Sequence, residues 1–331
     1  MKSNGGIPLI KRLTGLLLTF LLLSGCTGSS MQEDKTTDTT TIAVLLKGID
    51  NPHWQEMRKG ILDTAAARGV DIILLYPESE TNTQQQSLIF QDILEQQPDA
   101  LLWAPCDSSL GPQMKAMADA AGVPLFTVDT RADGVDLPYI GADNLRIGRI
   151  AAQELAQSSD YRGKFAVIAG PQNQQCHVER AEGFVQIMKT FPDIEVVDIC
   201  YPKSEYGFIP AMDVMQRLLD TYPDLSGVFC TSGVIGLGAA EQIKANYRQE
   251  QVLVVTQDTQ SDVLSAVNTG LVHAMVTQDG YEAGHLAINT ILSYLSGNEI
   301  KQNIYLSAEL LTWRNVDDFM KDYLQRRDAH D

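Results

Sequence analysis

The sequence predicts an α/β fold made of two doubly wound parallel-sheet lobes. Three observations support this prediction. The chain has 331 residues, which at roughly 150 residues per domain corresponds to about two domains. Short apolar runs alternate with segments of helical periodicity, as in successive βαβ units. The alternation runs to about residue 140 and then begins again.

The first half of the alternation begins with a β-branched apolar run at 41–46. In the segment that follows, Trp54, Met57 and Ile61 recur at helical spacing. Short, continuous apolar runs are typical of strands that are buried on both faces of a parallel sheet. The expected strands of this half are 41–46, 72–76, 100–103 and 125–128, and the expected helices are 52–68, 83–97 and 109–121.

The second half repeats the architecture, although no short-period repeat and no low-complexity linker is present. The expected strands are 165–169, 195–199, 227–230, 252–255 and 272–276. The expected helices are 145–157, 176–190, 209–221, 233–246, 263–269, 281–295 and 316–325.

The first thirty residues resemble a targeting segment. Three positive residues precede an apolar stretch at 13–23, which is shorter than a comfortable membrane span. Leu23-Ser24-Gly25-Cys26 resembles a bacterial lipobox. We therefore expect a lipoprotein signal peptide at 1–25, lipidation at Cys26 and a flexible tether at 26–40. A simple secretory peptide or an anchor helix is the alternative.

Composition and charge exclude several classes of protein. Hydrophobic residues make up 44% of the chain, and 25 basic against 42 acidic residues give a net charge of −17. This acidity argues against nucleic-acid binding, which needs a basic face. No Walker loop, G-x-S-x-G or HExxH motif is present, and the glycines at 233, 236 and 238 are in the wrong order for a dinucleotide loop. We expect no cofactor and no metal.

The cysteines leave two possibilities open. Cys106, Cys176, Cys200 and Cys230 are widely spaced, so no zinc module is indicated. Outside the cytosol they could form disulfides. Their spacing fixes no pairing, and free buried thiols are an equal alternative.

Polar side chains follow several of the expected strands. In open α/β sheets, ligands bind beyond the carboxyl ends of the strands. The turns at 47–54, 127–131, 254–258 and 276–279 combine aromatic, carboxylate and amide groups. A dry pocket with carboxylates for hydroxyl groups and an aromatic face for C–H groups suits a polyol.

Several ordered segments resemble type I periplasmic binding proteins, close to the ribose-binding branch. These segments are Asn51-Pro52 with two ring side chains after it, 124–129, 141–144, 179–184, 214–224, Asp258 and Gln278. The resemblance covers residues 41–312. It implies two lobes that close on a small ligand and are joined by three crossing strands, near 141–144, 277–279 and 307–311. It also implies an N-terminal lobe of 41–142 plus 279–308 and a C-terminal lobe of 143–278 plus 309–331.

The resemblance also implies which residues contact the ligand. The family's sugar-contacting positions correspond to Asn51, His53, Trp54, Asp129, Thr130, Tyr206, Ser232, Asp258 and Gln278. Arg131 joins this set because the family usually has an arginine where this chain has Thr130. A second usual arginine is Val178 here, and Ser232 stands where asparagine is common. Ribose is therefore in doubt, and another sugar, an inositol-like polyol or a sugar-derived signal stays open.

Simpler explanations exist for several of these residues. Asn51 before Pro52 is a normal helix N-cap, and Trp54 fits the core stripe of its helix. His53 is expected to be the more exposed of the two ring residues, and Asp258 could cap the helix that follows it. A buried carboxylate such as Asp129 is costly unless it is partnered.

Tyr206 could instead anchor its own helix, Ser232 could be a plain turn residue, and Arg131 could be a solvated charge. Arg180 and Glu182 are expected to form a structural pair rather than to bind ligand.

Three functions fit these residues to different degrees. The preferred one is a monomeric, lipid-anchored receptor on the extracytoplasmic face of the cell membrane, which captures a sugar or polyol and passes it to an ABC permease with separate ATPase chains. The alternative is a sensor whose closed form docks on a membrane histidine kinase or chemoreceptor. A remote alternative is an extracytoplasmic carbohydrate enzyme that uses Asp129 and Asp258 as an acid–base pair. No nucleophile motif is visible, so we expect no catalysis.

Overall fold

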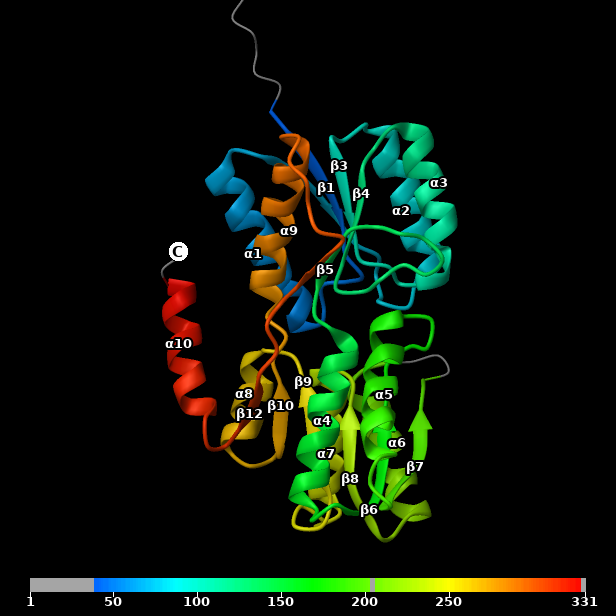
Figure 1. Ribbon diagram of the computed structural model, residues 1–331, viewed down its shortest axis with the longest axis vertical. Coiled ribbons are helices and arrows are strands. Elements are labelled where there is room, and N and C mark those ends of the chain that lie inside the picture. The colour runs from blue at the N-terminus through cyan, green and yellow to red at the C-terminus, as the bar shows by residue number, and fades with distance from the viewer. Residues whose placement is uncertain (1–38, 203–205, 329–331) are drawn as a thin grey trace, which may run out of the picture. The chain divides into compact units, whose positions relative to one another are not determined.

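The computed structural model describes residues 39–202 and 206–328, and it contains two six-stranded sheets with helices on both faces (Figure 1). The predicted α/β class with two doubly wound sheets is confirmed. Expectations for 1–25, for Cys26 and for most of the tether fall outside the described residues. Within the described part of the chain, no helix combines the length and apolarity that a membrane span requires.

The first sheet, with its helices, is called the N-terminal lobe. Its strands have the order β11-β5-β4-β3-β1-β2 and are all parallel. They are β1 (Thr41–Leu45), β2 (Asp71–Leu75), β3 (Ala100–Trp103), β4 (Leu125–Val128), β5 (Tyr139–Gly141) and β11 (Asn303–Tyr305). The helices are α1 (Pro52–Arg68), α2 (Thr83–Glu95), the 3-10 turn η1 (Ser108–Leu110), α3 (Gly111–Ala121) and α9 (Gly280–Leu295).

Alternating residues of β1 are buried on opposite faces of this sheet. Ile42 and Val44 pack with α1 and α9, whereas Ala43 and Leu45 pack with α2 and α3. The strand is therefore apolar at every position, as expected of a parallel sheet that is covered on both sides.

The second sheet, with its helices, is called the C-terminal lobe and repeats this order as β12-β10-β9-β8-β6-β7. Only the pair β12–β10 is antiparallel. The strands are β6 (Arg162–Ile168), β7 (Asp193–Cys200), β8 (Leu225–Cys230), β9 (Leu253–Gln257), β10 (Ala274–Val276) and β12 (Leu310–Thr312). The helices are α4 (Asn144–Ser158), α5 (Gln175–Met188), α6 (Phe208–Thr221), α7 (Gly233–Ala245), α8 (Ser261–Asn268) and α10 (Val316–Asp328).

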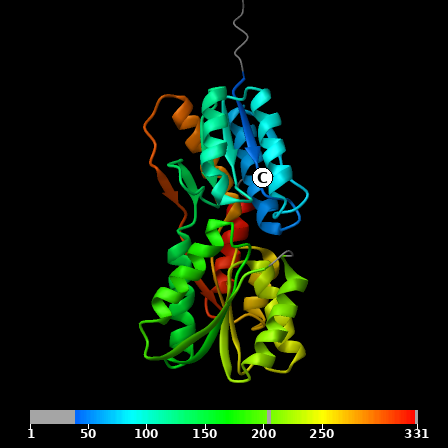
Figure 2. The same ribbon diagram turned by 90° about the vertical axis from the view of Figure 1, so that its right-hand side faces the viewer.

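The chain passes between the two sheets three times. It crosses after β5, after β10, and between β11 and β12 (Figures 1 and 2). The strands β5, β11 and β12 each have three residues, which is too short to show as an apolar run. They were not predicted as separate strands, although the resemblance implied crossing strands near 141–144 and 307–311. The predicted helix ends otherwise differ from the observed ones by a few residues.

Small residues let the helix pair α4 and α5 pack closely. A Cβ on Gly148 would overlap the carbonyl oxygen of Arg180, and one on Gly183 would overlap that of Leu145. The two helices therefore approach backbone to backbone. As a result, Asn144 at the start of α4 lies within hydrogen-bonding distance of Arg180 on α5.

Candidate ligand-binding site

Side chains from both lobes surround one small cavity at the carboxyl ends of the strands. From the N-terminal lobe it is lined by the predicted residues Asn51, His53, Trp54 and Asp129. From the C-terminal lobe it is lined by Tyr206, Ser232 and Asp258. This is the position at which open α/β sheets bind ligands.

Asp129 follows β4 and has the left-handed backbone conformation, with φ of 63°. Its Oδ1 accepts hydrogen bonds from Thr130 Oγ1 (2.8 Å) and from Lys47 Nζ (3.4 Å). Its Oδ2 accepts from Gln278 Nε2 (2.7 Å) and from His53 Nε2 (3.1 Å). A carboxylate has about four acceptor positions, so donors of the protein itself already satisfy Asp129.

The surroundings of Asp129 favour its ionised form. Burial alone would raise the pKa of this carboxyl group. The charge of Lys47 and the hydrogen bond from His53 outweigh burial and hold the pKa well below its usual value. Asp129 is therefore a carboxylate at neutral pH.

Lys47 is the most prominent site residue that the sequence did not indicate. Its ammonium group is fully buried and donates to Thr130 Oγ1 (2.6 Å) and, across the lobes, to Gln174 Oε1 (2.8 Å). Burial lowers the pKa of Lys47, but the nearby Cys176 and Asp129 raise it by more than burial lowers it, so the net shift of the pKa is upward. A charged residue directly after a buried strand was the available signal, and it is the same signal that singled out Asp129.

Direct bonds join the two lobes beside the cavity. The Gln174 amide accepts from Lys47 and donates to the Glu80 carbonyl oxygen (2.9 Å). The backbone N–H of Ser108 donates to the carbonyl oxygen of Asn173 (2.8 Å). These bonds hold the loop before α5 against the N-terminal lobe.

Arg180 lines the cavity, and its expected pairing with Glu182 is wrong. The guanidinium group donates to Asn144 Oδ1 (2.8 Å), to the Thr231 carbonyl oxygen (3.0 Å) and to Gln278 Oε1 (2.7 Å). Gln278 in turn donates to Asp129. Because its oxygen accepts from Arg180 and its nitrogen donates to a carboxylate, the orientation of the Gln278 amide is fixed.

Asp258 follows β9 and also has positive φ, at 80°. Its Oδ2 accepts from the backbone N–H of Gly233 (2.8 Å), and its Oδ1 accepts from Gln257 Nε2 (3.0 Å). It therefore caps the start of α7. The simpler explanation, in which Asp258 caps the following helix α8, is wrong. About two of its acceptor positions stay free. Nearby, Tyr206 donates to Ser232 Oγ (2.9 Å).

The structure does not bring every predicted residue to the cavity. Arg131 donates to Asn303 Oδ1 and to the Tyr305 hydroxyl, both at 2.6 Å, and its guanidinium group lies 4.2 Å from the Tyr139 ring centroid. These partners hold it against β5 and β11. Thr130 and Gln278 stand behind Asp129 and act on the cavity through it.

Two residues of the first turn combine a structural position with access to the cavity. His53 is 6% exposed and Trp54 is 2% exposed, so His53 is the more exposed of the two, as expected, but it is still buried because its ring reaches Asp129. Asn51 accepts from the His53 backbone N–H (3.1 Å) and donates to Glu80 Oε1 (3.2 Å). It is therefore a helix cap and a cavity residue at once.

Three further cavity residues were not predicted from the sequence, although one of them, Gln257, lies in the predicted turn at 254–258. His177 on α5 lies 2.8 Å from Thr231 Oγ1, and burial, together with the charge of Arg180, lowers its pKa well below the usual value. Burial raises the pKa of Glu80. Gln257, at the end of β9, also lines the cavity. Turn position alone distinguished none of these from ordinary polar residues.

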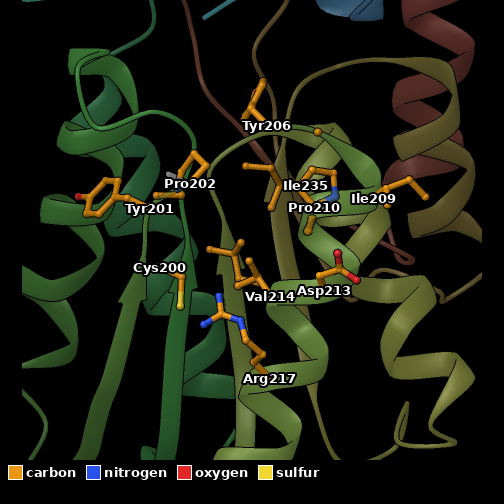
Figure 3. A pocket seen from close by; sticks show the side chains of 14 residues that line it. Cys200, Tyr201, Pro202, Tyr206, Ile209, Pro210, Asp213, Val214, Arg217 and Ile235 are labelled. Carbon is orange, nitrogen blue, oxygen red and sulfur yellow. The ribbon is translucent and has the colours of Figure 1, made fainter. Parts of the chain in front are cut away.

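The cavity has a volume of about 20 Å³, which is room for roughly one water molecule. A second pocket, of about 360 Å³, lies wholly within the C-terminal lobe beside α6, with Tyr206 at one end and Arg217 at the other (Figure 3). A third, also of about 360 Å³, involves the turns at 48–50 and 78–81. Tyr206 lines all three. Only the small cavity gathers the predicted residues from both lobes.

The cysteines in the described residues are all free thiols, which answers the open question of disulfides for these four. The Sγ atom of Cys176 lies 3.7 Å from Lys47 Nζ. Burial raises the pKa of the Cys106 thiol to about 12, so this thiol stays protonated. Across the described ranges no cluster of histidine, cysteine and carboxylate groups has the arrangement of a metal site.

Known proteins share this architecture along nearly the whole chain. The chain is 27% identical to the ribose import binding protein RbsB of Bacillus subtilis, over 90% of this chain and 97% of that protein. A carbohydrate transporter solute-binding protein from Agrobacterium radiobacter, solved in complex with D-arabinose, is 25% identical with a TM-score of 0.82, covering 87% of this chain and 99% of that one. The fructose-binding periplasmic domain of the hybrid two-component system BT1754 has a TM-score of 0.81 at 20% identity, covering 88% and 97%, and shows the shared fold.

A family profile gives the broader assignment. Residues 42–299 match the profile described as a periplasmic binding protein domain. The match includes both sheets except β11 and β12, and it contains every residue that lines the small cavity. The resemblance seen in the ordered sequence segments is confirmed, and the chain belongs to the periplasmic binding protein family.

Proposed function

We propose that this protein is a monomeric, extracytoplasmic solute-binding protein that captures a small neutral sugar or polyol between its lobes and delivers it to an ABC importer. The observation that carries the proposal is the meeting of Asp129, Asp258 and the ring residues of both lobes in one buried cavity. The similarity to a ribose import binding protein over nearly the full length of both chains supports it.

The charges in the cavity favour a neutral ligand. Lys47 is compensated by Asp129, and the positive charge of Arg180 lies near the carboxylates of Asp129 and Asp258. An additional full charge in this dry space would lack a partner and would pay a large desolvation penalty. Hydroxyl groups can use the free acceptor positions of Asp258, while C–H groups pack on the Trp54 and Tyr206 rings.

Ligand entry requires movement of the lobes. A cavity of about 20 Å³ is far below the roughly 300 Å³ or more of small-molecule sites. The three crossings between the sheets are where hinge motion can occur. A ligand that contacts both lobes then shifts the population toward the closed form, which the permease recognises.

An importer is a better-supported partner than a sensor kinase. The relative at 27% identity is an import binding protein, whereas the sensor domain at 20% identity supports the fold alone. The relatives are binding proteins, so we also propose that the chain does not alter its ligand. Copurification of the purified protein with permease or kinase subunits from its own cells would separate the two partners.

The lipid anchor is a further part of the proposal. Support comes from the apolar stretch at 13–23 and from the Leu-Ser-Gly-Cys sequence that ends at Cys26. A Cys26→Ser variant should lose incorporation of labelled palmitate and leave the membrane fraction. Retention of the label by this variant would refute the anchor and leave the ligand-binding proposal unaffected.

A thermal-shift screen tests the binding function. A ligand at a hundredfold excess over Kd stabilises the native state by about 2.7 kcal/mol. D-ribose, D-arabinose, D-allose, D-tagatose and myo-inositol are the first probes. At least one should raise Tm in the wild type and not in an Asp258→Ala variant, and NMR should recover that sugar unchanged. A shift of equal size in both proteins would place the site elsewhere.

A further inference from the structure

Two buried glutamines at and just after the end of β9 have side-chain amide atoms that lack partners. Gln257 is 1% exposed and Gln260 is 3% exposed. The Oε1 atom of Gln257 and both polar side-chain atoms of Gln260 have no hydrogen-bond partner. Buried polar atoms are nearly always satisfied, and an unsatisfied one costs about 1–3 kcal/mol. These atoms therefore call for an explanation.

Only one of the two glutamines faces the cavity. Gln257 is among the lining residues, whereas Gln260 is not. The Gln260 side chain instead packs over the first residue of α7, since its Nε2 lies 2.8 Å from the position that a Cβ on Gly233 would take. Two chemically identical side chains three residues apart thus differ in access to the cavity and in the bond that Gln257 makes to Asp258.

The orientation of the Gln257 amide is fixed by its neighbour. One end of the amide lies 3.0 Å from Asp258 Oδ1. A carboxylate only accepts hydrogen bonds, so this end must be the NH₂ group. The other end is the carbonyl oxygen, and it is the end without a partner. A residue that lines the cavity therefore has an acceptor without a partner.

Gln257 and Asp258 together carry acceptors on either side of the Gln257 NH₂ group. Asp258 keeps about two free acceptor positions after bonding Gly233 and Gln257. The carbonyl oxygen of the adjacent Gln257 side chain adds a further free acceptor. A set of acceptors of this kind is matched by a ligand with two neighbouring hydroxyl donors.

We infer that Gln257 is a specificity-determining residue that accepts a hydrogen bond from one hydroxyl group of the bound polyol, beside the hydroxyl group that binds Asp258. This inference rests on the proposed sugar-binding function and adds to it the ligand's chemistry, a vicinal diol facing the C-terminal lobe. A site built to bond a hydroxyl rejects an analogue without it, because the protein acceptor is then left unpaired.

Calorimetric titration with deoxy sugars tests the inference. The sugar that binds the wild type most tightly among D-ribose, D-arabinose, D-allose, D-tagatose and myo-inositol is compared with its monodeoxy analogues. We expect one analogue to bind the wild type at least about tenfold more weakly than its parent. In Gln257→Met, the same analogue and the parent should bind within about twofold of each other, because the acceptor is gone.

Gln260 supplies a matched control. Gln260→Met removes the neighbouring buried amide, which does not line the cavity, and it should keep the wild-type discrimination between parent and analogue. Gln257→Asn, which withdraws the carbonyl group by one methylene, replaces Gln257→Met if the latter does not fold. It should also lose the discrimination.

The possible outcomes are distinct. If the sugar binds but every analogue shows the same ratio in the wild type and in the Gln257 variants, Gln257 has no role in specificity and an ordered water satisfies its carbonyl group. If Gln260→Met abolishes discrimination equally, the effect belongs to the segment 257–260 as a whole and the inference is also wrong. If none of the five sugars binds the wild type, the proposed function fails, and the inference fails with it.

Discussion

The two lobes place an aspartate at the same topological position and use it differently. Asp129 follows the fourth strand of its lobe and Asp258 follows the fourth strand of the other, and both have positive φ. Four protein donors fill the acceptor positions of Asp129, among them a buried ammonium group. Two neutral donors bond Asp258 and leave it half free.

We interpret this difference as a structural role for Asp129 and, under the proposed function, a ligand-binding role for Asp258. In the N-terminal lobe the carboxylate neutralises Lys47 and organises His53 and Gln278 around itself. In the C-terminal lobe the carboxylate and its neighbour Gln257 have acceptors without a partner. The charged pair therefore lies within the N-terminal lobe and organises that side of the cavity. Under the proposed function, the acceptors of Gln257 and Asp258 bind the ligand.

The largest expected difference between the two aspartates is in stability without ligand. Asp129→Ala leaves the Lys47 ammonium buried and uncompensated, which should lower the free energy of unfolding by about 3–5 kcal/mol. Asp258→Ala removes bonds from neutral donors and should lower it by about 1–3 kcal/mol. Urea denaturation of both variants measures the two losses.

The double variant Lys47→Met/Asp129→Leu provides the control for this difference. Replacing both members of a buried ion pair by apolar residues is often close to neutral. The double variant should therefore be more stable than Asp129→Ala alone. Equal losses for Asp129→Ala and Asp258→Ala would mean that the two carboxylates have the same role, and the contrast between the lobes would not hold.

The expected effect on ligand affinity is smaller than the effect on stability, and it falls on Asp258 and not on Asp129. Asp258→Asn keeps an acceptor for the Gly233 N–H but brings an NH₂ group toward the cavity and toward Gln257. Losing a hydrogen bond to a charged acceptor costs about 1.5–3 kcal/mol, so Kd for the best sugar should rise roughly ten- to a hundredfold. Calorimetry gives Kd. A variant that binds as tightly as the wild type would show that Asp258 does not touch the ligand.

The two buried histidines, one from each lobe, should respond to pH with opposite sign. Burial lowers the pKa of His53, but the Asp129 hydrogen bond and nearby carboxylates raise it more, so the net shift is upward. The stability that His53 contributes is therefore fully present below its unfolded pKa, near 6.5, and is lost as pH rises through its folded pKa. Burial and the charge of Arg180 lower the pKa of His177, so its contribution is present above pH ~6.5 and is lost as pH falls through its lowered folded pKa.

Melting curves at pH 5 and pH 8 separate these effects. The Tm advantage of the wild type over His53→Gln should be larger at pH 5 than at pH 8. The advantage over His177→Gln should be larger at pH 8. If both variants shift in the same direction between the two pH values, the two histidines lie in similar electrostatic surroundings, contrary to the structure.

Much of the site could be predicted from the sequence because strand ends converge in this fold. Asp129, Asp258 and the ring residues of the first turn all follow apolar runs, and the structure brings them to one cavity. Lys47 follows an apolar run as well, but a lysine is usually on the surface. Its burial is tolerable because of partners that are distant in the sequence, Asp129, Thr130 and Gln174. The role of Gln257 could not be predicted for a related reason. Whether it offers an acceptor depends on which end of its amide group bonds Asp258, and only the structure shows this.

The smallest expected effect concerns Arg131, which the sequence placed in the ligand set. In the structure its partners are Asn303, the Tyr305 hydroxyl and the Tyr139 ring, next to the crossing between the sheets. Its Nε also lies 3.7 Å from the Glu179 carboxylate on α5. Arg131→Met keeps the length of the side chain and removes the guanidinium group. Because this group does not line the cavity, Kd for the best sugar should change by less than about twofold. Loss of its two hydrogen bonds should lower the free energy of unfolding by about 1–2 kcal/mol.

Calorimetry and urea denaturation of Arg131→Met test the two halves of this expectation. Arg180→Met is the matched comparison, because Arg180 lines the cavity and holds Gln278 against Asp129. It should weaken binding far more than Arg131→Met does. Comparable losses of affinity in both variants would mean that the guanidinium group at 131 reaches the ligand, and that the family's arginine is displaced by one position here and not absent.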